Sequence, residues 1–160
     1  MRSVRLGLVL AVLLGLGAGA SPAAQSQMLR AHGLRVVAPA GWHLADQLLS
    51  DCTDPTQALA VTNTTRTFGP AAAVPRGTAL VLVLEDHGVN SPSGFPARKH
   101  FTLPAHAGLL GGCCNTPSGP GYEFLFRDQG RDFYAYVYAS KRALAQEAVA
   151  ILRTLRVTPS

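Results

Sequence analysis

The chain has 160 residues, of which 48% are hydrophobic and 14% are charged, and its formal net charge is +5. This length and composition fit a single compact domain with substantial loops and exclude a disordered tail. The basic residues form no continuous run and do not alternate with aromatic residues, so the sequence does not predict a nucleic-acid partner.

The first twenty residues have the pattern of a secretory signal peptide. Arg2 and Arg5 form a basic start, residues 6–16 an apolar run, and Ala18-x-Ala20 a small-residue cleavage site. The apolar run is short and interrupted by glycine, so it would not serve as a permanent membrane span. We therefore predict cleavage after residue 20 and a secreted or periplasmic protein. Twelve basic and nine acidic residues then remain, a net charge of about +3.

The mature chain begins with a predicted flexible lead-in over residues 21–32, and a single domain follows over residues 33–160. Alternating apolar side chains predict a first strand over residues 33–38. Trp42, the only tryptophan, is predicted to anchor the core because its side chain buries a large area. Leucines that share one helical face predict a short helix over residues 44–49.

The middle of the chain predicts three strands. Residues 57–66 are rich in Ala, Val and Thr, and residues 78–85 are almost continuously apolar. The second of these is typical of a central strand that is covered on both faces. Apolar and polar residues alternate again over residues 97–103, whereas residues 104–120 are rich in glycine and predict a long exposed loop.

The last third of the chain predicts a β-hairpin followed by a helix. Aromatic and aliphatic residues alternate over residues 122–127 and 133–138 around a turn at 128–130, which indicates one inward face. Ser140 is the expected N-cap of the helix. The apolar stripe of that helix is Leu144, Ala148, Ile151, Leu152 and Leu155.

These elements predict an α+β fold, an antiparallel β-sheet flanked by helices, with a C-terminal β-hairpin followed by an amphipathic helix. Residues 38–42 (Ala-Pro-Ala-Gly-Trp), the hairpin segment 130–136 and the last helix over 148–155 resemble exported bacterial members of the Mog1/PsbP-like group. The resemblance covers both ends of the mature chain and implies an antiparallel sheet sandwiched between helices. Its motifs are structural, so it implies no catalytic or ligand-binding residue.

The three cysteines, Cys52, Cys113 and Cys114, would meet an oxidising compartment after export. We expect a disulfide that joins Cys52 to Cys113 or Cys114, because adjacent cysteines rarely bond to each other. It would close a loop of about sixty residues and hold the glycine-rich segment 109–121 against the segment after Trp42. The third cysteine is then free, buried or paired with another molecule.

His100 and His106 precede Cys113 and Cys114, and imidazole and thiolate are ligands that suit copper(I) or zinc. These four residues are therefore a candidate metal site. The spacing matches neither CxxC nor HExxH, so polar loop histidines are the simpler interpretation. No other cofactor is predicted.

Tyr134, Tyr136 and Tyr138 share one face of a predicted strand, with Arg127 and Arg131 nearby. Tyrosine offers a rigid amphipathic surface, so these five residues are a candidate binding surface. The same stripe would also pack beneath a helix or line the outer face of the sheet, and this structural interpretation is the simpler one.

No catalytic residue is predicted, because the chain lacks a GxSxG motif and its nearest serine–glycine segment, 91–94, contains proline. We expect an exported accessory or binding module and not an enzyme. The partner of this module is expected to be an unknown protein or small ligand in the cell envelope. The alternative is a copper- or zinc-binding or thiol-active protein that uses the three cysteines and the two histidines.

Overall fold

The computed structural model describes residues 25–49, 53–67, 69–88, 94–110, 114 and 116–159. The predicted signal peptide lies outside these residues. No helix in the described part is long and apolar enough to cross a membrane. The described elements are β1 (Ser26–Ala31), β2 (Leu34–Pro39), β3 (His43–Leu44), β4 (Thr56–Thr62), β5 (Ala79–Asp86), β6 (Gly108–Leu110), β7 (Gly119–Asp128), β8 (Arg131–Ala139), α1 (Arg142–Arg153) and β9 (Arg156–Val157).

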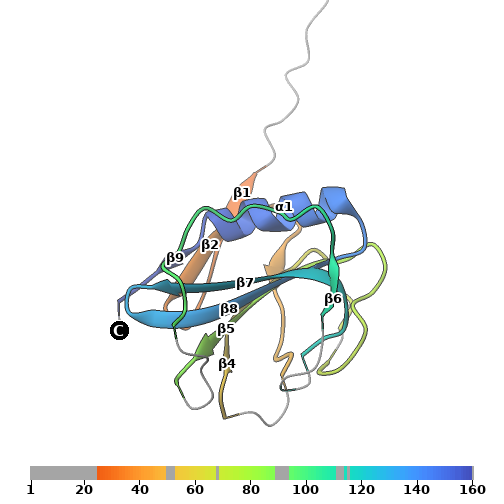
Figure 1. Cartoon of the computed structure of the whole chain (residues 1–160). Helices are drawn as coiled ribbons and strands as arrows, with labels where there is room; N and C mark the ends of the chain where they lie inside the picture. Colours follow the sequence, from red (N-terminus) through yellow and green to blue (C-terminus); the bar gives the residue numbers. More distant parts are fainter. Residues whose placement is uncertain are drawn as a thin grey trace, which may run out of the picture.

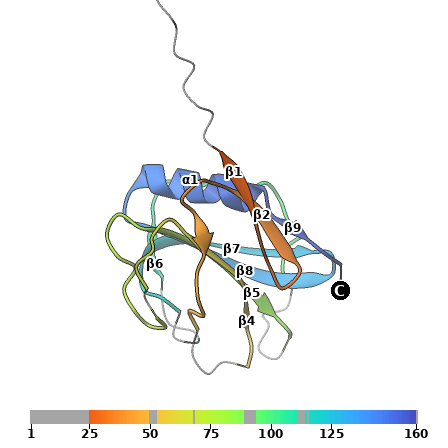
Figure 2. The same cartoon turned by 180° about the vertical axis from the view of Figure 1, so that it is seen from behind.

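Two antiparallel sheets and one helix make up the described fold. The larger sheet has the strand order β3-β4-β5-β8-β7-β6, and the smaller sheet has the order β1-β2-β9. Helix α1 lies across one face of the larger sheet, where it contacts β5 and β8 (Figure 1). The smaller sheet stands beside the helix and contacts it through β2 (Figure 2). Loop residues cover the opposite face of the larger sheet.

Strand β5 runs through the centre of the larger sheet and is covered on both faces. Its residues 79–84 are all buried. Val81 and Val83 belong to the main core under α1, whereas the leucines of this strand belong to a second cluster on the other face. The prediction of a central strand from the continuous apolar run is therefore confirmed.

The β7–β8 hairpin confirms the predicted turn and pairing. Its two-residue loop is Gln129-Gly130, and both residues have positive φ (51° and 78°), as a type I′ turn requires. The expectation of a single inward face is wrong, because both faces of the hairpin are covered. Phe133 packs in the main core on the side of α1, whereas Tyr138 packs in the second cluster.

Helix α1 forms with the predicted periodicity and buries one stripe on the larger sheet. Its N-cap is Lys141 and not Ser140. The Ser140 hydroxyl instead accepts a hydrogen bond from the Gly77 N–H (3.2 Å). The buried helix residues are Ala145, Ala148, Val149, Ile151 and Leu152.

Trp42 joins the two sheets to the helix, as expected of a core anchor. Its side chain is 2% exposed and belongs to the main core. The indole Nε1 donates a hydrogen bond to Oε1 of Glu147 on α1 (2.7 Å). Gly41, with a φ of 88°, makes the turn that leads into it. The chain between β2 and β3 is thus held against the helix.

The predicted fold, in which helices flank the sheet, is wrong because the described domain is mostly β and α1 is its single helix. Residues 44–49 do not form the predicted short helix. A helix of so few residues has little stability of its own. The Gln57 side chain binds this segment instead. It donates to the Asp46 carbonyl oxygen (3.1 Å) and accepts from the Leu48 N–H (2.8 Å). Leu48 thereby packs into the second cluster.

Residues 97–103 do not form the predicted strand. Ala97 makes one isolated bridge with Arg127, and no ladder continues from it in the described structure. Phe101 is buried because its ring packs edge-on against two phenylalanines of β7 (5.2 and 5.5 Å between ring centroids). The alternation in the sequence therefore reflects side-chain packing and not strand pairing.

The segment 21–32, expected to be a lead-in, contains strand β1. A two-residue turn at His32 and Gly33, with φ of 43° and 76°, pairs β1 with β2 in continuous register. The predicted loop over 104–120 likewise contains β6 and the first residues of β7. Strand β6 has three residues, too few for periodicity to reveal it, and the largely exposed strand β1 has no apolar alternation in its sequence.

Candidate functional site

Three arginines lie side by side on the outward face of the smaller sheet. Arg35 on β2 is directly opposite Arg30 on β1 and directly opposite Arg156 on β9. Opposed residues of antiparallel strands point to the same face, with Cβ atoms about 4.5–5.5 Å apart. All three arginines are exposed, whereas Leu34 and Val36 point into the core.

An exposed apolar pair continues this surface. Met28 is directly opposite Val37, and their exposed fractions are 49% and 39%. Beside them lies a pocket of about 460 Å³ lined by Arg35, Arg153 and Arg156. We name this surface the arginine face, and its residues are Met28, Arg30, Arg35, Val37, Arg153 and Arg156.

The pocket is built on rigid elements. Thr154, at the C-terminal end of α1, also lines it. Its Oγ1 accepts a hydrogen bond from the Val37 N–H (2.7 Å) and donates one to the Ile151 carbonyl oxygen (2.7 Å). The end of the helix is thereby fastened to β2, which fixes Arg153 relative to the sheet.

Among the described residues, no acidic side chain forms an ion pair with the arginine face. The strands of the smaller sheet contain neither Asp nor Glu. Arg30 donates hydrogen bonds to the thioether sulfur of Met28, whereas Arg153 and Arg156 donate to backbone carbonyl oxygens. In the part of the chain that the structure describes, the ion pairs are Arg98–Asp128, Arg127–Asp132 and Arg131–Glu85, and none involves this surface.

The predicted surface of tyrosines and arginines is divided by the sheet. Tyr134, Tyr136 and Tyr138 point away from α1, whereas alternation along β8 places Arg131 on the α1 face. Arg127 donates hydrogen bonds to the carboxylate of Asp132, and Arg131 donates to the carboxylate of Glu85, and these bonds raise the pKa of both guanidinium groups. Tyr138 is fully buried, and the other two tyrosines are half-buried against the second cluster. These positions favour the packing interpretation.

The Tyr138 hydroxyl is buried, and no hydrogen-bond partner satisfies it among the described residues. Burial raises the pKa of this phenol, and the side chain of Thr116, which lies near the hydroxyl without a well-formed hydrogen bond to it, lowers the pKa to a smaller extent. We expect Tyr138→Phe to raise the free energy of unfolding by about 1 kcal/mol, because an unpaired buried hydroxyl costs roughly 1–3 kcal/mol. Urea unfolding followed by circular dichroism measures the change. Tyr122→Phe serves as the control, and a loss of stability in Tyr138→Phe would show that the hydroxyl is paired.

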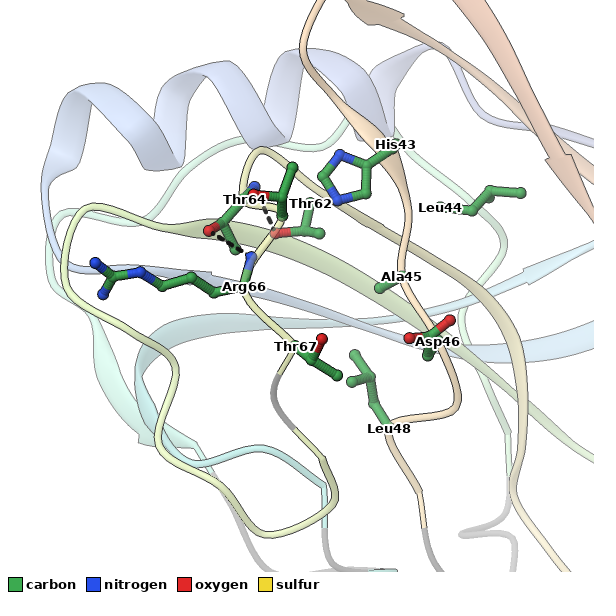
Figure 3. A pocket seen from close by; sticks show the side chains of 10 residues that line it. His43, Leu44, Ala45, Asp46, Leu48, Thr62, Thr64, Arg66 and Thr67 are labelled. Atoms are coloured by element: carbon green, nitrogen blue, oxygen red, sulfur yellow. Dashed lines mark hydrogen bonds between the residues drawn. The ribbon is translucent and has the colours of Figure 1, made fainter.

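A second pocket, of about 290 Å³, lies between β3 and the chain that follows β4 (Figure 3). His43 lies near Thr62 and Thr64, whereas the Arg66 side chain extends away from them. The Thr62 hydroxyl forms hydrogen bonds with backbone groups: its Oγ1 donates to the Ala79 carbonyl oxygen and accepts from the Thr64 N–H. No hydrogen bond joins His43 to an acid or a hydroxyl among the described side chains. This pocket therefore shows no nucleophile–base pair.

The predicted disulfide involves two residues outside the described part of the chain, Cys52 and Cys113. Cys114 Sγ lies 3.8 Å from the carbonyl oxygen of Asp54. Asp54 follows Cys52 by two positions, so this contact favours Cys114 as the partner of Cys52. We propose a Cys52–Cys114 disulfide, which leaves Cys113 as the remaining cysteine.

The predicted copper or zinc site stays a prediction, since Cys113 lies outside the described residues. Among those that the structure describes, no group of three or more His, Cys, Asp or Glu side chains is arranged to hold a metal ion. His100 lines a pocket with Arg98, Lys99 and Arg153. Positive charges that line the same pocket oppose the binding of a metal cation.

The arginine face is absent from the predictions because its residues are scattered along the chain. Arg30 and Arg35 flank the His32-Gly33 turn, and Arg156 lies close to the other end of the chain. A two-residue hairpin turn places residues equidistant from it opposite each other. Recognition of that turn would have paired Arg30 with Arg35. Nothing local in the sequence indicates that β9 adds Arg156 beside them.

Comparison of the chain with protein-family models, curated proteins and solved structures gives no match. The resemblance to the Mog1/PsbP-like group therefore stays a prediction, as does export to the periplasm or medium. The function has to be argued from the geometry and charge of the arginine face.

Proposed function

We propose that the protein is an exported, non-enzymatic binding module that attaches to a polyanionic ligand of the cell envelope through the arginine face. The cross-strand row Arg30–Arg35–Arg156 carries the proposal. Guanidinium groups bind phosphate and carboxylate oxygens in a bidentate manner. Neighbouring strands are about 4.8 Å apart, so the row matches a ligand with closely repeated negative charges.

The stability of the sheet gives a second argument for this function. Like charges directly opposite each other on neighbouring strands destabilise a sheet. The smaller sheet holds two such pairs, Arg30↔Arg35 and Arg35↔Arg156, and its strands have no acid to offset them. An anionic ligand would relieve this repulsion. Unfavourable arrangements of this kind are typical of functional surfaces.

The variant Arg30→Gln/Arg35→Gln/Arg156→Gln tests the proposal, with inorganic polyphosphate as the probe. If each arginine neutralises one phosphate, wild-type affinity should fall on the order of 40-fold between about 50 and 200 mM salt. We expect the triple variant to lose most of the binding and of this salt dependence. It should also unfold at a higher urea concentration than the wild type, because the repulsion between the arginines is removed.

The matched control is Arg66→Gln/Arg76→Gln/Lys141→Gln, which removes the same charge from exposed positions elsewhere. This control should bind polyphosphate nearly as well as the wild type. Equal loss in both triple variants would contradict the proposal, since net charge alone would then account for binding. A triple variant of the arginine face that is less stable than the wild type would point to a structural role for these arginines.

A further inference from the structure

We infer that the ligand is the surface of an anionic phospholipid membrane, on which the arginine face docks while Met28 and Val37 enter the headgroup region. This inference rests on the proposed function and names the ligand of the same surface. It concerns peripheral attachment by a sheet face and requires no membrane-spanning segment.

The exposed apolar pair favours a membrane over a soluble polyanion. Met28 and Val37 are opposite each other, at 49% and 39% exposure, one pair away along the same face from Arg30 and Arg35. A dissolved polymer of phosphate or sulfate groups gains nothing from such side chains. A membrane interface accepts apolar side chains below the phosphates while arginines remain at the level of the phosphates.

The pocket of about 460 Å³ provides a place for a lipid phosphate. Arg35, Arg153 and Arg156 line it, and all three are exposed. Met28 and Val37 also line the pocket, so charged and apolar walls meet in one concave surface. A phosphodiester held by the guanidinium groups would place its acyl chains beside the apolar pair. The geometry therefore fits a molecule with one anionic and one apolar part.

Other exposed leucines lack this combination and provide a control. Leu44 on β3 and Leu125 on β7 are 43% and 39% exposed, close to the values for Met28 and Val37. Neither leucine lines a pocket with an arginine of the smaller sheet. Exposure of apolar side chains is thus shared by several surfaces, whereas among the described strands the cross-strand row of arginines lies on the smaller sheet.

Flotation with unilamellar vesicles tests the inference. We expect the protein to bind vesicles of phosphatidylcholine and phosphatidylglycerol in a ratio of about 3:1, and not vesicles of phosphatidylcholine alone. Arg35→Gln/Arg156→Gln should weaken this binding about 25-fold, at about fivefold for each arginine. Met28→Gln/Val37→Thr should weaken it by about tenfold or more while leaving polyphosphate binding unchanged. All variants carry the same N-terminal segment, so differences between them are due to the arginine face.

The control Leu44→Gln/Leu125→Gln should bind the anionic vesicles like the wild type. Absence of binding to these vesicles, or binding that Met28→Gln/Val37→Thr leaves unchanged, would overturn the membrane inference. The proposed function would survive either result if polyphosphate binding still depended on the three arginines of the row. If the arginine variants changed neither kind of binding, both proposals would fall.

Discussion

The Trp42→Ala variant is expected to lose about 3–5 kcal/mol of unfolding free energy, the usual effect of removing a buried indole. Trp42 is 2% exposed in the main core, where no solvent would fill the space that the ring leaves. A domain of this size has a total stability of roughly 5–15 kcal/mol, so the variant should be close to unfolding. Urea denaturation followed by far-ultraviolet circular dichroism measures the loss. Tryptophan fluorescence is unsuitable because the chain has one tryptophan.

Two further variants separate packing from hydrogen bonding at this position. Trp42→Phe keeps most of the apolar surface but removes the donor to Glu147, and should cost about 1.5–3 kcal/mol. Glu147→Gln keeps an acceptor oxygen for the indole and should cost less than Trp42→Phe. If Trp42→Ala were no less stable than Trp42→Phe, the hydrogen bond and not the packing would be the main contribution of Trp42.

The Cys114→Ser variant should lose about 4 kcal/mol, whereas Cys113→Ser should remain close to the wild type. The proposed bridge from Cys52 to Cys114 closes a loop of about sixty residues and so restricts the conformations of the unfolded chain. Removal of such a crosslink stabilises the unfolded state and lowers the free energy of unfolding by about 4 kcal/mol. The contact between Cys114 Sγ and the Asp54 carbonyl oxygen is the structural basis for this choice of partner. Urea unfolding without reducing agent, together with peptide mapping of the oxidised protein, measures both effects.

Reduction of the wild type provides the internal control for the bridge. With dithiothreitol, the wild type should become as unstable as Cys114→Ser, and that variant should change little. Loss of stability in Cys113→Ser alone would assign the bridge to Cys113. Three reactive thiols in the native protein would rule out an intramolecular disulfide.

Elements with many residues and a regular pattern were predictable from the sequence. The apolar run of β5, the alternation in the β7–β8 hairpin and the stripe of α1 each extend over eight or more residues. A hydrophobic pattern of that length determines the secondary structure even where a single tertiary contact favours another conformation. The predicted α+β fold is wrong because its second helix, over residues 44–49, depended on three leucines. The Gln57 side chain instead binds the Leu48 N–H and the Asp46 carbonyl oxygen in a non-helical segment.

The candidate site was not predictable, since it depends on which strands become neighbours. The cysteines are candidates because export would expose them to an oxidising compartment, whereas the histidines and tyrosines are candidates because they lie close in sequence to other polar or aromatic residues. The arginines of the smaller sheet come together only when the His32-Gly33 turn pairs β1 with β2 and when β9 returns after α1. Such long-range pairing leaves no local pattern.

The hydroxyl of Thr154 has a consequence for self-association. Strand β9 is two residues long, so it covers only the Leu34–Arg35 part of the outer edge of β2. Further along β2, the Val37 N–H donates its hydrogen bond to Thr154 Oγ1 at the end of the helix. An uncovered strand edge is where a second copy of a protein adds and aggregation begins. The threonine therefore blocks the addition of a second copy at this part of the β2 edge while the arginine face remains exposed.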